Sequence, residues 1–181
     1  LEGYSPIIGV ISRFTEWKGV QYIIPAFQRL LKDFPKAKLV LANAIGDYEN
    51  EINKLLAELP LGSYEKIFFE PDMATLFKTF DVFVHVPIDN HSEAFGQVYI
   101  EALAGGIPMV CTRSGIANEC VIHLENAYVV DYKDCDSIYL GLITLLENND
   151  LKEKLMDNAP KSVTNYTVDN KFNLLRDLYN E

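Results

Sequence analysis

Two glutamates separated by seven residues are the most informative feature of this 181-residue chain. Glu93 stands just before Phe95 and Gly96, where a loop is expected to become a helix, and Glu101 lies about one turn inside that helix. A helix N-terminus that begins with glycine lets backbone N–H groups approach a phosphate. A carboxylate one turn deeper is suited to ribose hydroxyls, so the segment predicts a nucleotide site.

The neighbours of Glu101 are apolar, which predicts that its carboxylate is buried. It lies within residues 98–104, where every other residue is uncharged and apolar or aromatic. A buried carboxylate costs several kcal/mol unless a partner hydrogen-bonds to it. We therefore expect Glu101 to be buried and to bind a ligand, against the alternative of an ordinary helix glutamate that faces solvent.

Two cations follow the first apolar segment of the chain. Arg13 comes directly after residues 7–12, which are predicted to form a buried strand, and Lys18 follows shortly after. Ligands of parallel α/β sheets bind beyond the carboxyl ends of the strands, and an arginine fork can hold a diphosphate through two hydrogen bonds. Taken alone, the pair would be read as ordinary charges on a solvated loop; with the two glutamates, it predicts a diphosphate site.

Apolar strands alternate with amphipathic helices along the chain. Strands that are apolar throughout and separated by such helices indicate a parallel sheet covered on both faces. The predicted fold class is therefore α/β, with a doubly wound, mostly parallel Rossmann-like sheet and extra C-terminal helices. The predicted strands are residues 7–12, 38–43, 66–70, 81–86, 108–112 and 127–130.

The helix predictions carry two specific expectations. Pro25 lies inside the first helical pattern, where an interior proline removes a hydrogen bond, so this helix is expected to start near Ile24 or to have irregular first turns. Asp47 is expected to cap the second helix. A short helix is predicted over residues 73–80, and three helices are predicted at the C-terminal end, the last of them after Thr167.

Composition limits the classes of partner. The net charge of −10 argues against nucleic acid, which needs a basic surface, but not against a small phosphorylated ligand. The histidines, cysteines and acids show no metal-site spacing, so we predict no bound metal and no tightly bound cofactor. Three widely spaced cysteines indicate reduced thiols and a cytoplasmic location. No apolar run reaches the ~20 residues of a membrane helix.

These motifs together resemble those of family 4 (group 1) retaining glycosyltransferases, which have the GT-B fold and a Glu-x7-Glu signature. Residues 86–110 and 114–119 follow the family pattern in order, and Arg13 with Lys18-Gly19 is similar to the family's strand-end arginine and Lys-Gly pair. The resemblance covers nearly the whole chain. It implies that residues 1–181 are the C-terminal, nucleotide-sugar-binding domain, and that an N-terminal acceptor-binding domain is absent from this fragment.

The resemblance also implies roles for single residues. Arg13 and Lys18 would hold the diphosphate, Glu101 the ribose, and Glu93 would act catalytically beside the donor sugar. The donor-binding set would further include three residues at the loop-to-helix junction, Phe95, Gly96 and Gln97.

The nucleobase pocket implied by the resemblance falls on residues 68–73. Phe69, Glu70 and Met73 would form it, since an aromatic strand end before a proline can stack or clamp a base. A core strand followed by a turn explains this segment equally well.

The activity implied by the resemblance is transfer of a sugar from a nucleoside diphosphate sugar to a glycan or lipid-linked acceptor, as in polysaccharide biosynthesis. We expect a hexosyltransferase whose isolated donor-binding domain is inactive and whose partner is the N-terminal domain of the same polypeptide. The resemblance allows peripheral contact with the inner face of the membrane.

Several alternatives stay open. The chain could be a non-catalytic nucleotide-binding module of a glycan-synthesis assembly, or another GT-B enzyme such as a nucleotide-sugar epimerase. A dinucleotide dehydrogenase is disfavoured, since Gly-x-Gly-x-x-Gly is absent after the first strand. Ile116 stands where the family has a second glycine, and a β-branched residue does not readily adopt positive φ, so that loop is expected to differ in shape. His85 alternates with apolar strand residues and is interpreted as a core residue.

Overall fold

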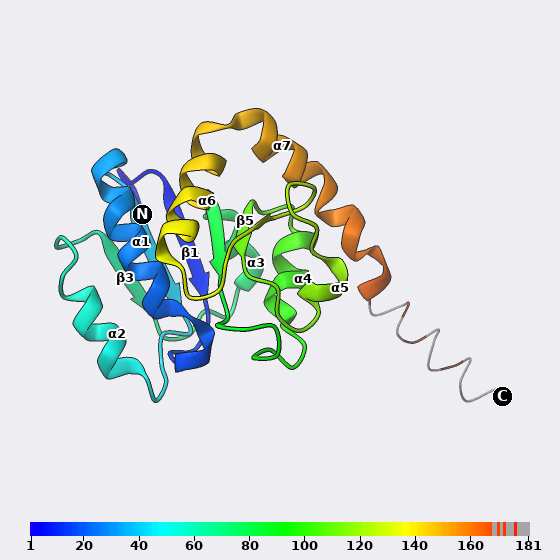
Figure 1. Cartoon of the computed structure of the whole chain (residues 1–181), viewed down its shortest axis with the longest axis horizontal. Coiled ribbons are helices and arrows are strands. Elements are labelled where there is room, and N and C mark those ends of the chain that lie inside the picture. The colour runs from blue at the N-terminus through cyan, green and yellow to red at the C-terminus, as the bar shows by residue number, and fades with distance from the viewer. Residues whose placement is uncertain (168–169, 171, 173–175, 177–181) are drawn as a thin grey trace.

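The computed structural model describes residues 1–167, 170, 172 and 176 (Figure 1). The helix predicted after Thr167 falls largely outside these residues and stays a prediction. Within the described part, six parallel strands form one sheet in the order β3-β2-β1-β4-β5-β6, which confirms the predicted α/β class. The strands are β1 (Ile7–Ile11), β2 (Lys38–Ala42), β3 (Tyr64–Ile67), β4 (Val82–His85), β5 (Met109–Cys111) and β6 (Tyr128–Val129).

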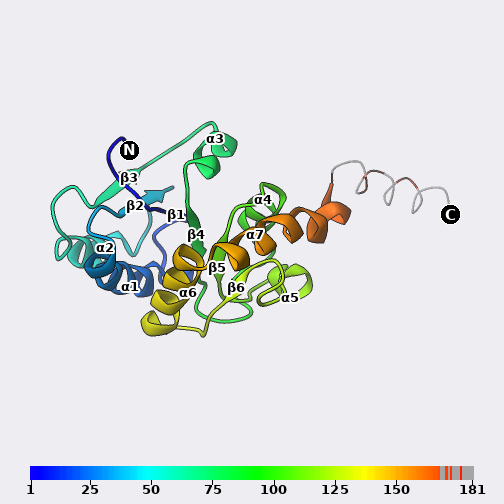
Figure 2. The same ribbon diagram turned by 90° about the horizontal axis from the view of Figure 1, so that it is seen from above.

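Helices cover both faces of this sheet, as Figure 2 shows from above. One face carries α1, α2 and α6, and the other carries α3 and α4. Their bounds are η1 (Glu16–Lys18), α1 (Val20–Asp33), α2 (Glu49–Leu56), α3 (Met73–Lys78), α4 (Gln97–Ala104), α5 (Ala117–Cys120), α6 (Cys135–Glu147), α7 (Asn149–Asn158) and η2 (Pro160–Tyr166).

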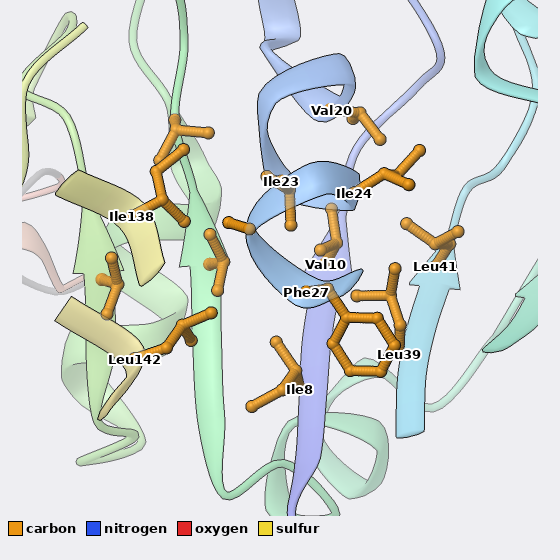
Figure 3. Close-up of a cluster of buried hydrophobic side chains, with 14 of the residues drawn as sticks. Ile8, Val10, Val20, Ile23, Ile24, Phe27, Leu39, Leu41, Ile138 and Leu142 are labelled. Carbon is orange, nitrogen blue, oxygen red and sulfur yellow. The ribbon is translucent and has the colours of Figure 1, made fainter. Parts of the chain in front are cut away.

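The strands are buried on both sides because successive side chains point to opposite faces. Ile8 and Val10 of β1 pack under α1, together with residues of β2 and α6 (Figure 3). Ile7 and Ile11 point to the opposite face, which packs against α3 and α4. Gly9 leaves room there for the ring of Phe80, since a Cβ on Gly9 would lie 2.1 Å from that ring. The alternation anchors β1 in the centre of the molecule.

Two helix predictions are wrong in detail. Helix α1 begins at Val20 and continues through Pro25; burial of Val20, Ile23 and Ile24 in the core offsets the one hydrogen bond that the proline removes. Asp47 is exposed and does not cap α2, whose N-cap is Tyr48. The Tyr48 backbone N–H donates to the Phe14 carbonyl at 2.9 Å, which fixes the loop in another conformation.

The third strand lies earlier than predicted. The ladder between β2 and β3 ends at the pair Ala42 and Ile67, so the two phenylalanines that follow lie outside the sheet. Glu70 and Asp72 then turn the chain: the Glu70 carboxylate accepts from the Asp72 backbone N–H at 2.9 Å, and Asp72 caps α3. The hydrophobicity of this segment reflects exposed aromatic residues of the loop rather than a longer strand.

Candidate functional site

The strand order reverses between β1 and β4, which lie side by side at the centre of the sheet. Chains leaving two such strands pass to opposite faces, and ligands of open α/β sheets bind in the crevice that this creates. Arg13 and Lys18 follow β1, and Glu93 follows β4. Three of the residues predicted to act on a ligand therefore lie on the two loops that flank this reversal.

Lys18 and Glu93 meet across the reversal. The Lys18 ammonium lies 2.5 Å from Oε1 of Glu93, and the two side chains are only 14% and 7% exposed. Removing one partner of a largely buried ion pair leaves an uncompensated charge and is strongly destabilising. The pair joins residues that are distant in the sequence, a contact that the motifs did not predict.

Gly19 allows Lys18 to reach this position. Its φ is +75°, and a Cβ there would lie 1.9 Å from the Val86 carbonyl oxygen. A glycine lets the start of α1 lie directly against the chain leaving β4, with Lys18 just before it. Gly19 thus permits the close approach of the two chain segments, and Lys18 beside it pairs with Glu93.

His85 is a third partner in this cluster, and its role was missed in the sequence. Its side chain is 1% exposed, and Nε2 lies 2.9 Å from the same Oε1 of Glu93. The interpretation as a core residue is right about burial but omits this contact. A polar residue at the carboxyl end of a central strand, near the ligand edge, is the signal that could have found it.

The two buried acid–base groups have pKa values that keep Glu93 charged and His85 neutral. Burial alone would raise the pKa of Glu93, but hydrogen bonds from His85 and Lys18 outweigh it and lower that pKa below its ordinary value. Burial also lowers the pKa of His85, and contact with Glu93 only partly opposes this effect. The cluster therefore carries one negative charge on Glu93 and one positive charge on Lys18.

The N-terminus of α4 has no side-chain cap. Its N-cap is Gly96, with φ of +85° and no side-chain hydrogen bond to the first turn, so the helix N–H groups there receive no cap. A Cβ on Gly96 would meet the Tyr99 ring at 2.8 Å, which explains the glycine on packing grounds as well. Phe95 and Gln97, on either side of it, are exposed.

Glu101 differs from its predicted burial. It is half-buried, and Oε1 accepts a hydrogen bond of 2.8 Å from the exposed Gln97 amide. The apolar residues of α4 do not surround it, since the helix buries Tyr99, Ala102 and Leu103 on one side and presents Glu101 at the border of that side. The Glu101 carboxylate is accessible to a ligand without a buried, unpaired charge.

A cavity of about 450 Å³ lies between α3 and α4. Met73 and Glu101, both predicted to bind the donor, are on its wall, and Lys78 adds a positive charge. Its remaining lining is mainly apolar and consists of Ala74, Phe77, Ala104, Gly105 and Ile107.

The other predicted donor residues lie on the surface. Phe69 is 77% exposed, and the Glu70 carboxylate is occupied by the turn described above. Arg13 is exposed at the end of β1, and it takes part in none of the ion pairs between described residues. The structure thus pairs Lys18 with Glu93, places Met73 and Glu101 on the wall of one cavity, and leaves Arg13 and Phe69 facing solvent.

The loop after β5 packs against the segment that contains Glu93 and Phe95. Ser114 Oγ accepts from the Glu93 backbone N–H at 2.9 Å, and a Cβ on Gly115 would lie 2.7 Å from the Phe95 carbonyl oxygen. Ile116 has φ of −61°, so the position needs no second glycine. The replacement of a glycine by isoleucine leaves this loop unstrained.

Within the part of the chain that the structure describes, no three His, Cys, Asp or Glu side chains cluster to hold a metal ion. None of the described helices has the length and apolar character needed to cross a bilayer.

Comparison with solved structures identifies the fold as one half of the GT-B fold. The Anabaena protein Alr3699/HepE, solved in complex with UDP and glucose, superimposes with a TM-score of 0.84 at 23% identity, over 96% of this chain and 48% of that one. The C-terminal domain of a group 1 glycosyl transferase (LpcC) from Francisella tularensis superimposes with a TM-score of 0.76 at 25% identity, over 91% of this chain and 88% of that one.

The family follows from the sequence match. Residues 2–162 match the family described as glycosyl transferases group 1, and the chain belongs to it. An uncharacterized glycosyltransferase of Methanocaldococcus jannaschii, MJ1607, is 33% identical over 166 residues, which are 88% of this chain and 41% of that protein. The chain therefore spans less than half the length of this relative.

Proposed function

We propose that this chain is the donor-binding domain of a retaining glycosyltransferase that uses a nucleoside diphosphate sugar. The Lys18–Glu93 pair across the strand reversal carries the proposal, because it brings a cation suited to a diphosphate next to an acid suited to a sugar. Family membership and the HepE structure, which holds UDP and glucose, support it.

Electrostatic stabilisation of the leaving group is the proposed contribution of the two cations. When the bond between the sugar and the diphosphate breaks, negative charge builds on the diphosphate oxygens, and donors placed at those oxygens lower the barrier. Arg13 and Lys18 would supply such donors, and the uncapped N–H groups of α4 at Gly96 would add backbone donors. Binding of the diphosphate would draw Lys18 partly away from Glu93.

Glu93 would then act on the sugar. It is ionised, since its pKa is lowered, and it lies beside the cation proposed to hold the diphosphate. A carboxylate in this place can orient sugar hydroxyls or stabilise the positive charge that develops on the ring. Phe95, Gly96 and Gln97 would border the same space.

The cavity between α3 and α4 would take the nucleoside. Glu101 on its wall is placed to accept hydrogen bonds from ribose hydroxyls, and Met73 with the apolar lining is suited to the faces of a base. Phe69 and Glu70, in the loop that leads into α3, would close over the base edge.

The rest of the reaction belongs to a partner domain in this proposal. Since the chain spans less than half of MJ1607, we propose that the acceptor site lies on an N-terminal domain of the same polypeptide and that residues 1–181 alone have little transferase activity. The acceptor would be a glycan or lipid-linked glycan in polysaccharide biosynthesis, and the complete enzyme would work as a hexosyltransferase in the cytoplasm or at the inner face of the membrane.

A thermal-shift screen of the 181-residue chain tests this proposal. UDP, GDP and ADP, each with and without an attached hexose, are added at increasing concentration. A ligand present at 100 times its Kd stabilises the folded state by about 2.7 kcal/mol, so one nucleotide should raise the Tm in a saturable way. Failure of every nucleotide to raise it would contradict the proposal.

The same ligands separate the proposal from its alternatives. Product analysis of a mixture with the bound nucleotide sugar would show an isomerised sugar for an epimerase and an unchanged donor for the isolated domain of a transferase. Unchanged donor with both the isolated chain and the full-length polypeptide, supplied with acceptor, would favour a non-catalytic module.

A further inference from the structure

The His85 ring contacts two aromatic rings, which restrict its orientation. It stacks on Phe83 with ring centroids 6.2 Å apart, and the Tyr99 ring meets it edge-on at 4.7 Å. Tyr99 is fixed in turn, because its hydroxyl donates to the Thr112 carbonyl at 2.8 Å. Strand β4, helix α4 and the residue that follows β5 together therefore set the direction in which the histidine points.

The chemistry of Glu93 determines which nitrogen of His85 carries the proton. An ionised carboxylate offers only acceptors, so Nε2 must donate to Oε1. Nδ1 is buried and has no partner among the described residues, which agrees with a neutral ring that carries its proton on Nε2. The histidine is thus a fixed hydrogen-bond donor beside the Lys18–Glu93 pair.

The two carboxylate oxygens of Glu93 differ in their hydrogen bonds. Oε1 is shared by Lys18 and His85. Oε2 accepts no hydrogen bond from the described residues, and it is not among the fully buried polar atoms that lack a partner. It is therefore not fully buried and keeps unused acceptor capacity, on an otherwise buried side chain.

We propose that His85 is a positioning residue for the donor sugar, holding Oε1 of Glu93 so that Oε2 stays available to the sugar. The inference rests on the proposed function and deepens it. When the diphosphate competes for Lys18, the hydrogen bond from His85 is the contact that keeps Glu93 in place. A residue with this role matters for the sugar and not for the nucleotide.

Ligand pairs that differ only in the sugar test this role. The Kd values of the 181-residue chain are measured by calorimetry for UDP, GDP and ADP and for the corresponding nucleoside diphosphate glucose or mannose. His85→Leu should weaken the sugar-bearing ligand about tenfold, as expected for losing a hydrogen bond to a charged group, and leave the free nucleotide within about twofold. His85→Gln, which can still donate, should restore most of the loss.

A matched control and a measurement on the unmodified chain complete the test. His123→Gln alters an exposed histidine whose Nδ1 accepts from the Val129 backbone N–H, and it should change neither Kd. If His85→Leu does not fold, ¹⁵N spectra of the wild-type histidines still decide: the ring should be neutral with the proton on Nε2, and the His85 signals should move further with the sugar-bearing ligand than with the nucleotide alone.

Equal weakening of nucleotide and nucleotide sugar in His85→Leu, or no weakening of either, would overturn the positioning role. So would a proton on Nδ1, or equal shifts with the two ligands. If the wild-type chain binds none of the nucleotides, the proposed function itself fails. If the wild-type chain binds them and His85→Leu binds them equally well, only the positioning role of His85 fails.

Discussion

At the scale of single residues, Glu93 is central because it connects a cation and a neutral hydrogen-bond donor. Lys18 balances its charge, and His85 fixes one of its oxygens. Since Glu93 and His85 are largely buried and their pKa values are lowered, their protonation is tied to folding.

Stability should depend on pH through His85 between about pH 7 and 5. Burial lowers the pKa of His85 below the ordinary 6.5, although contact with Glu93 partly opposes this, so below that pH the unfolded chain binds a proton that the folded chain does not. Stability then falls as pH falls, with a slope of up to about 1.4 kcal/mol per pH unit. Glu93, with a pKa below 4.5, loses its contribution only at lower pH.

Urea unfolding of wild type and His85→Gln at half-unit pH steps checks this prediction. The variant should show a flatter dependence between pH 7 and 5, because glutamine does not titrate. Parallel curves for the two proteins would show that His85 takes up its proton equally in the folded and unfolded states.

At the scale of elements, close contact between the residue before α1 and the residue after β4 sets the geometry of the site. Gly19 makes this contact possible, since any side chain would collide with the Val86 carbonyl. The sequence identifies Lys18-Gly19 as a pair but not this reason, because the contact joins segments far apart in the chain.

Gly19→Ala should destabilise the chain far more than Gly3→Ala. Both glycines have positive φ, at +75° and +85°, but a Cβ on Gly3 would meet nothing within 4 Å. Gly3→Ala should cost about 1–2 kcal/mol at most, the strain of the left-handed conformation. Gly19→Ala should cost at least about 3 kcal/mol, since strain and a backbone collision combine. Equal losses in chemical denaturation would show that the contact with Val86 is unimportant.

The sequence predicts periodic features well and contact-dependent features poorly. The strands β1, β2 and β4 follow from apolar runs, but the contact between Lys18 and Glu93 was not predicted. The end of β3 was misplaced because Phe68 and Phe69 look like strand residues until the ladder with β2 is seen. The partial exposure of Glu101 and the contact of His85 with Glu93 depend on which side chains pack beside them, which no local pattern specifies.

At the scale of the whole molecule, the net negative charge of the chain opposes binding of the proposed anionic ligand. The chain carries a net charge of −10, so a nucleoside diphosphate approaches a protein of the same sign. Lys18 is already paired with Glu93. Arg13, exposed at the end of β1 and outside the ion pairs of the described residues, is then the cation most available to attract and hold the diphosphate.

Calorimetric titration of Arg13→Ala with the nucleotide identified by the thermal-shift screen tests the central claim most directly. Because Arg13 is exposed, its removal should change stability by no more than about 0.5 kcal/mol. Affinity should fall about 10- to 100-fold, the equivalent of one or more hydrogen bonds to a charged group. Arg29→Ala, which removes an exposed arginine paired with Asp136, should leave affinity unchanged. Equal affinity of Arg13→Ala and wild type would contradict the account.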